Sequence, residues 1–172
     1  MIKFSYLFLM TGLCCLLELL LRNFGFFFPC CALFVFYAAT AFGFSWGVGA
    51  SCLGALGRDF AGAGASHPWS VLILIGIAYL AELWLQRVES DSVLVNFLPG
   101  LLIPLLVWLY SLIFFTQHFW TVLVKQLPVI FPVSVLCAVC LPGMILLLDS
   151  LNEKLSLPLF ADARQKRKSR PR

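Results

Sequence analysis

The sequence predicts an all-α, polytopic integral membrane protein with six short transmembrane helices. Hydrophobic residues make up 62% of the 172 residues and charged residues only 12%, whereas a soluble domain is about 45–50% apolar and about 25% charged. Charged residues and prolines divide the chain into apolar runs. In lipid, the backbone polar groups of each run must be paired within that run, so we expect the runs to be helices.

The first run covers residues 4–21 and follows Lys3, as the apolar core of a secretory signal would. The small residues of a cleavage site do not follow it, and it is long enough to span a bilayer. We therefore interpret it as a retained anchor helix. The other apolar runs cover residues 29–44, 45–57, 68–85, 93–115 and 128–148.

Residues 29–57 decide the number of helices, because no charged residue interrupts them. At about 1.5 Å per residue, this stretch is too long for one upright helix and short for two. Glycines beside Trp46 favour a turn within residues 42–47, since tryptophan prefers the membrane interface. Two helices here give six in total, and one fused helix gives the five-helix alternative.

Positive charges predict the orientation, because cytoplasmic loops carry an excess of Lys and Arg. Six helices place on one side Lys3, Arg87, Lys154 and the six cations of the last nine residues, and on the other side Arg22, Arg58 and Lys125. Both termini are therefore expected in the cytoplasm. The five-helix alternative keeps the C-terminal tail there and moves Lys3 outside.

Two regions follow from this distribution. Residues 1–150 are predicted to form the transmembrane helical bundle, and residues 151–172 an interfacial segment with a basic cytoplasmic tail. The tail has too few apolar residues to fold alone, and its charge suits anionic lipid headgroups or an acidic cytoplasmic partner. We expect membrane lipids as partners and no nucleic acid.

The cysteines and acidic residues have structural explanations. The seven cysteines lie in apolar runs and are interpreted as small buried hydrophobes, and Cys137 and Cys140 lack a second pair for a metal site. Glu18 can pair with Arg22 on the first helix, and Glu82 lies close to Arg87. We therefore expect no metal and no cofactor.

An enzyme is not expected either. His67 and His118 fall in predicted loops, and neither a nucleophile with a neighbouring base nor a helical H-E-x-x-H motif is present. An intramembrane enzyme would need Glu18, Glu82 and Asp59 to converge. Their predicted positions lie at opposite interfaces.

A stripe of small residues marks the third run. Gly43, Gly47, Ser51 and Gly54 recur every three or four residues, so they share one helix face, and small side chains let helices approach closely in lipid. The face could pack against a helix of this chain or against another protein. The candidate partner-binding residues are Gly43, Gly47, Ser51, Gly54, Arg58 and Asp59, of which the last two are expected to end the helix at the outer interface.

Between residues 26 and 85 the chain resembles the rod shape-determining MreD family. The resemblance is carried by Pro29 with Leu33, the glycines and acid Gly43, Gly47, Gly54 and Asp59, the turn glycines Gly62 and Gly64, and the pair Tyr79 and Leu80. Arg58 departs from the family, which usually has an apolar residue before the acid.

This resemblance implies a small multi-pass protein of the bacterial inner membrane. It implies a non-enzymatic adaptor of the elongation machinery, which regulates cell shape and lateral peptidoglycan synthesis. The implied partners are the bitopic protein MreC and, through it, MreB and the wall-synthesis enzymes. It also implies a six-helix architecture similar to the substrate-binding subunits of energy-coupling-factor transporters, a likeness of fold that carries no ligand.

The alternative function is that of a transporter subunit that binds a small, vitamin-like solute. Prolines lie inside the last two helices, at Pro99, Pro104, Pro132 and Pro142. Kinked helices can line a cavity or simply form an irregular bundle. In the transporter alternative, these two helices and the loop at residues 58–68 close a pocket.

Overall fold

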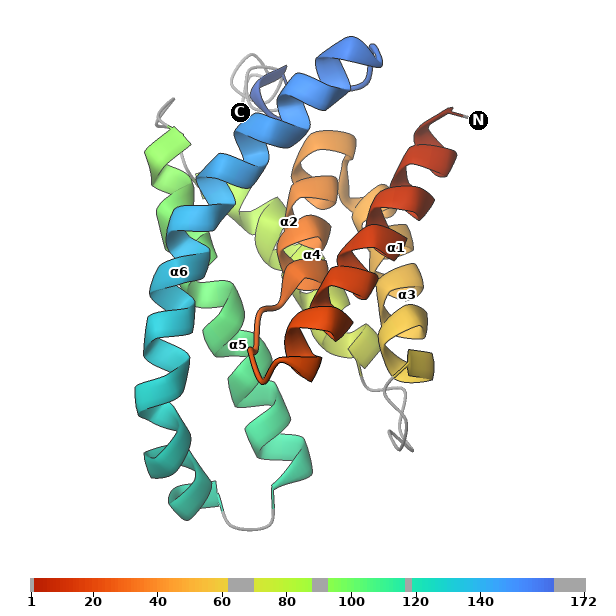
Figure 1. Ribbon diagram of the computed structural model, residues 1–172. Helices are drawn as coiled ribbons and strands as arrows, with labels where there is room; N and C mark the ends of the chain where they lie inside the picture. The colour runs from red at the N-terminus through yellow and green to blue at the C-terminus, as the bar shows by residue number, and fades with distance from the viewer. Residues whose placement is uncertain (1, 62–69, 88–92, 117–118, 163–172) are drawn as a thin grey trace.

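The computed structural model describes residues 2–61, 70–87, 93–116 and 119–162. Within these ranges the chain contains helices and no strand (Figure 1). The helices are α1 (Ile2–Asn23), α2 (Cys30–Phe42), α3 (Phe44–Ala61), α4 (Ser70–Arg87), the 3₁₀-helix η1 (Val93–Asn96), α5 (Phe97–Phe115) and α6 (Phe119–Lys154). The predicted all-helical fold is confirmed. Gly62, Gly64, His67, Pro68, His118 and the cations of the tail lie outside the described residues.

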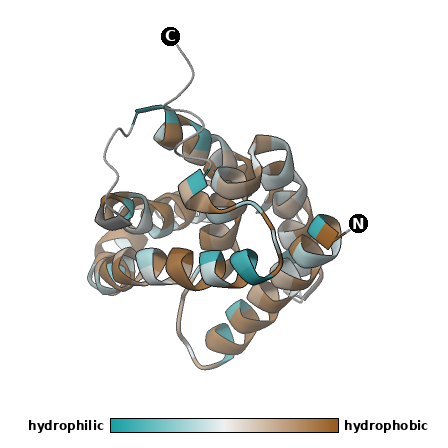
Figure 2. Cartoon of the chain, turned by 90° about the horizontal axis from the view of Figure 1, so that it is seen from above, coloured by the Kyte–Doolittle hydropathy of each residue, from teal (hydrophilic) through white to brown (hydrophobic). Residues whose placement is uncertain are grey.

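Four of these helices are long and apolar enough to cross a membrane, namely α1, α4, α5 and α6. Large apolar side chains also remain on the outside of the bundle, among them Phe8, Leu13 and Leu20 of α1. Viewed from above, most of the helical ribbon carries hydrophobic colours (Figure 2). An apolar exterior of this kind suits a membrane protein, because lipid replaces water as the surrounding solvent.

A tight turn at Gly43 separates the two helices of the uncharged stretch. Helix α2 ends at Phe42 and α3 begins at Phe44, and Gly43 between them has a φ of 101°. Glycine adopts this left-handed region at little cost because it has no Cβ. The predicted turn is confirmed, and the fused helix of the five-helix alternative is wrong.

Helix α2 forms the centre of the bundle. Every residue from Cys30 to Ala41 is buried, and the helix contacts α1, α3, α4 and α5, which surround it in Figure 1. A helix that is apolar on all sides is stable only when it is covered on all sides. The short length of α2 therefore fits its place inside a shell of other helices.

Glycines bring specific helix pairs close together. A Cβ built on Gly47 of α3 would lie 2.8 Å from the Cα of Ala39 in α2, and one built on Gly100 of α5 would lie 2.8 Å from the Cα of Ala138 in α6. Both distances are too short for a real side chain. Backbone therefore rests almost directly on backbone at these two crossings, as is common in membrane helix packing.

The C-terminal part of α6 is tied to the centre of the bundle. The hydroxyl of Tyr37 donates a hydrogen bond to Asp149 Oδ1 at 2.6 Å and accepts one from Asn152 Nδ2 at 2.8 Å. Asp149 Oδ1 also accepts from the amide N–H of Phe160 at 3.0 Å. Leu157 and Phe160 are buried in the core, so the bundle continues past residue 150, which falls inside α6.

The start of α1 and the end of α6 lie at the same end of the bundle, at the top of Figure 1. Helix α6 is 36 residues long and continues through Pro128, Pro132 and Pro142. Pro99 lies in the first turn of α5, where a missing N–H leaves no hydrogen bond unmade, so only Pro104 lies in the interior of that helix.

We predict that Gly47→Ala destabilises the protein, because the added methyl group collides with the backbone of Ala39. Overpacking of this kind costs about 1–3 kcal/mol, which thermal unfolding in detergent would detect as a lower Tm. Gly49→Ala is the matched control, since it lies on the same helix and its Cβ would have nothing within 4 Å. Equal melting temperatures for the two variants would contradict the close contact between α2 and α3.

Candidate functional site

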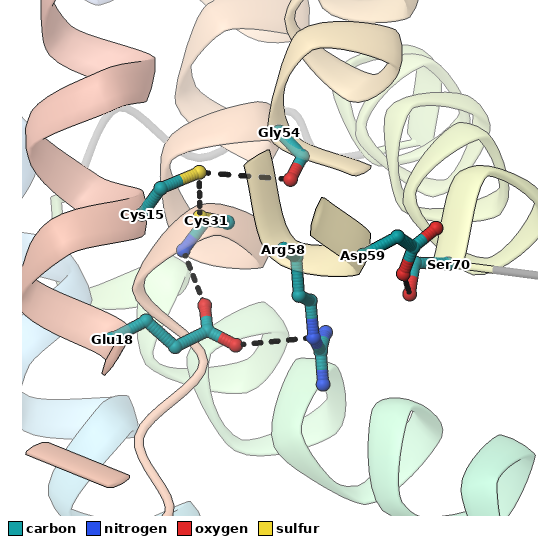
Figure 3. A network of polar contacts seen from close by, with 7 residues as sticks. All are labelled: Cys15, Glu18, Cys31, Gly54, Arg58, Asp59 and Ser70. Carbon is teal, nitrogen blue, oxygen red and sulfur yellow. Dashed lines mark hydrogen bonds and ion pairs between the residues drawn. The ribbon is translucent and has the colours of Figure 1, made fainter. Parts of the chain in front are cut away.

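A partly buried polar cluster lies where α1, α2 and α3 meet, and Glu18 is at its centre (Figure 3). Glu18 Oε1 lies 3.4 Å from Arg58 Nε, and Glu18 Oε2 accepts a hydrogen bond from the amide N–H of Cys31 at 3.1 Å. Cys31 is in the first turn of α2, where amide groups lack helical partners and the helix dipole favours negative charge. One carboxylate thus joins three helices.

This geometry corrects the pairing expected from the sequence. Glu18 pairs with Arg58 of α3 instead of Arg22, which is four residues away on its own helix and is exposed. The side chain of Glu18 is only 13% exposed, so it points into the bundle, where a partner from another helix is available. Local spacing alone does not contain that information.

Arg58 and Asp59 also have separate partners. Both lie in α3, as expected for residues near its end. Asp59 Oδ1 accepts a hydrogen bond from the hydroxyl of Ser70 at 2.6 Å, and Ser70 is the first residue of α4. Asp59 therefore connects the end of α3 to the start of α4, while Arg58 turns toward α1 (Figure 3).

Two thiols pack beside the carboxylate. Cys15 Sγ lies 3.3 Å from Cys31 Sγ and 3.6 Å from the carbonyl oxygen of Gly54. A Cβ on Gly57 would lie 2.9 Å from Cys15 Sγ, so the glycine makes room for the sulfur. All seven cysteines were predicted to be buried. Cys15, Cys30, Cys31 and Cys137 are buried in the structure, whereas Cys52 is exposed.

Gly47, Ser51 and Gly54 of the small-residue stripe face the inside of this chain, whereas Gly43 forms the turn before α3 and its Cβ would have nothing within 4 Å. Gly47 rests on Ala39 of α2, and Gly54 faces Thr11, Leu74 and Cys31 of three other helices. Ser51 is fully buried and its hydroxyl donates to the carbonyl oxygen of Gly47 at 2.8 Å. The sequence left open whether this face packs against a helix of the same chain or against another protein. In the structure it packs against helices of the same chain. In this conformation Gly47, Ser51 and Gly54 are not available to a partner protein.

A cavity of about 480 Å³ adjoins the Glu18 cluster. It lies between α1 with the following linker, Arg58 of α3, and the facing parts of α5 and α6. Its charged lining residues are Glu18, Arg22 and Arg58, its aromatic ones Phe26, Phe27, Phe28 and Trp108, and the others Cys15, Leu19, Gly25, Ser111, Gln126, Val129, Ile130 and Val133. The volume is in the range of small-ligand sites, about 300–1,000 Å³.

The transporter alternative expected the last two helices to close a pocket, but none of the α5, α6 and linker residues that line this cavity was identified from the sequence. Trp108 Nε1 donates to Gln126 Oε1 at 2.7 Å, which holds one aromatic wall in place. Gln126 is a polar residue beside the predicted sixth run, and Phe26–Phe28 form an aromatic run between Arg22 and Pro29. The polar Gln126 and the three consecutive phenylalanines are visible signals in the sequence. Neither signal predicts which helices pack around these residues to form a cavity.

Other chemistry in the described ranges is sparse. No group of three His, Cys, Asp or Glu side chains that could hold a metal ion occurs there. No protein-family model, curated protein or solved structure matches the chain. The charged and aromatic side chains that line the cavity beside Glu18 are suited to binding a small molecule.

We predict that Arg58→Met lowers the stability more than the double variant Arg58→Met with Glu18→Gln. Without the cation, the mostly buried Glu18 carboxylate keeps only the hydrogen bond from the Cys31 amide. We expect this to lower the free energy of unfolding by about 1–3 kcal/mol, as for a partly exposed ion pair. The glutamine of the double variant is neutral and can still accept from Cys31. Thermal unfolding in detergent measures both.

Arg22→Met is the control for this pair of variants, since Arg22 lines the same cavity and is exposed. We expect a small change in Tm for it. If Arg22→Met lowered the Tm as much as Arg58→Met, or if the second substitution recovered none of the loss, the ion pair would not be the stabilising contact.

Proposed function

We propose that this chain is a non-enzymatic membrane adaptor of the bacterial elongation machinery, with six crossings of the inner membrane and both termini in the cytoplasm. The resemblance of residues 26–85 to the MreD family supports this proposal, as does the bundle of apolar helices. The distribution of Lys and Arg supports the orientation. In this role the protein binds an MreC-like bitopic protein and, through it, MreB and the wall-synthesis enzymes.

The observation that carries the proposal is the outer face of α1. Only Tyr6, Leu7, Thr11 and Cys15 of this helix are buried. The opposite face has a shallow groove lined by Phe4, Ser5, Phe8, Leu9, Gly12, Leu13 and Leu16. A Cβ on Gly12 would have nothing within 4 Å, so the groove is open at its centre.

A bitopic partner contributes a single membrane-spanning helix, and a groove with glycine at its floor lets such a helix approach closely. We assign this groove to the MreC-like partner, because Gly47, Gly54 and Gly57 of α3 already pack against other helices of this chain. Aromatic and leucine side chains on either side of Gly12 would then pack against the partner helix.

We predict that Gly12→Leu reduces the amount of MreC-like partner that co-purifies in mild detergent from the native host, by several-fold or more. The leucine fills the groove without disturbing the bundle. Gly76→Leu is the matched control, since Gly76 lies on α4, is exposed, and its Cβ would also have nothing within 4 Å. Equal recovery with the two variants would exclude the groove, and absence of any wall-elongation protein would exclude the adaptor function.

The second candidate function is binding of a small, vitamin-like solute as a transporter subunit, and the cavity beside Glu18 favours it. Arg58 and the facing parts of α5 and α6 line this cavity, as that alternative expects, while most of the loop at 58–68 lies outside the described residues. Co-purification of an ATPase pair in the experiment above would support this candidate over the adaptor.

A further inference from the structure

The cavity beside Glu18 has an unbalanced charge. Its ionisable lining groups are one carboxylate, Glu18, and two guanidinium groups, Arg22 and Arg58. Both oxygens of Glu18 have partners, Arg58 Nε and the Cys31 amide. A cation could therefore use this carboxylate only by breaking those contacts, whereas the positive charge of Arg22 is left in excess.

Arg58 also retains donors that can face a ligand. A guanidinium group has five N–H donors, and the ion pair found among the described residues uses the Nε of Arg58 alone. Figure 3 shows the two terminal nitrogens of Arg58 directed away from Glu18. Planar N–H groups of this kind match the oxygens of a carboxylate or a phosphate.

Apart from Ser111 and Gln126, most of the remaining lining is apolar or aromatic. Phe26, Phe27, Phe28 and Trp108 contribute rings, and branched side chains of α6 complete the wall. Trp108 is fixed by its hydrogen bond to Gln126. Such walls do not suit a small hydrated anion such as inorganic phosphate, but they suit the hydrocarbon or aromatic part of a larger molecule.

We propose that this cavity binds a ligand with one anionic group, a phosphodiester or a carboxylate, attached to an apolar body. Arg58 and Arg22 hold the anion, and Trp108 with the linker phenylalanines contacts the apolar part. A lipid of the surrounding bilayer and a dissolved aromatic carboxylate both have this chemistry. Binding of such a ligand does not depend on the adaptor function, and a dissolved ligand of this class would fit the second candidate function.

The test uses the full chain purified in detergent and two matched pairs of probes. The lipid pair is dioleoyl phosphatidylglycerol and dioleoyl phosphatidylcholine, which differ in net charge, and native mass spectrometry counts the bound lipid. The soluble pair is 2-naphthoate and the neutral 2-naphthalenemethanol, and their effect on thermal unfolding measures binding. We expect the anionic member of at least one pair to bind more strongly, by about tenfold, as a charge-assisted hydrogen bond provides.

Three variants assign that preference to the cavity. Arg22→Gln and Arg58→Gln should each lower binding of the anionic probe by about tenfold and leave the neutral probe unchanged. Arg22 is exposed, so its variant keeps the test valid if Arg58→Gln folds poorly. Lys125→Gln is the control, because Lys125 is an exposed cation next to Gln126 that does not line the cavity.

Preference for phosphatidylglycerol alone would identify the ligand as a lipid, and preference for 2-naphthoate alone would identify it as a solute. The proposal is overturned if neither anion binds better than its neutral partner, or if Lys125→Gln has the same effect as the arginine variants. Either negative result leaves the co-purification experiment on Gly12 and Gly76 unaffected, so the two proposals fail separately.

Discussion

The carboxylate of Glu18 is the interaction on which this end of the bundle depends. A charge surrounded by apolar helices is tolerated only when it is paired, and here one partner is the guanidinium of Arg58 and the other is an amide at the start of α2. These contacts fix where α2 begins relative to α1 and α3. The placement of α2 in turn bears on the rest of the fold, because this helix contacts α1, α3, α4 and α5, and its Tyr37 is hydrogen-bonded to Asp149 and Asn152 of α6.

Close backbone contact is the second constraint, and it follows from the solvent. Between lipid-facing helices there is no hydrophobic driving force, so association depends on van der Waals contact and on polar pairs. Gly47 provides such contact between α3 and α2, and Gly100 provides it between α5 and α6. The chain thus has two closely packed groups of helices. The cavity lies where α5 and α6 face α1 and α3, and the charged groups that line it there are those of Glu18, Arg22 and Arg58.

Much of the fold could be predicted from the sequence, since apolar runs in lipid have few alternatives to helices. The turn at Gly43 was predictable because glycine and Trp46 occur together in an uncharged stretch. The partner of Glu18 was not, because helical spacing favours Arg22 and the contact with Arg58 arises only from tertiary packing. The small-residue stripe was recognised as a packing face, but a single sequence does not specify which helix covers it. The cavity was the least predictable feature, since it depends on how the α5–α6 pair sits against the remaining helices.

The return of the chain after α6 has a consequence for how the basic tail can be studied. The amide of Phe160 is bonded to Asp149, and the same carboxylate holds the hydroxyl of Tyr37 in the middle of the bundle. Residues up to Phe160 therefore belong to the folded unit. A deletion meant to remove only the tail's positive charge has to begin beyond this point. An earlier stop codon would also remove the buried side chains of Leu157 and Phe160 and the amide that bonds to Asp149, so a resulting loss of function would report loss of folding.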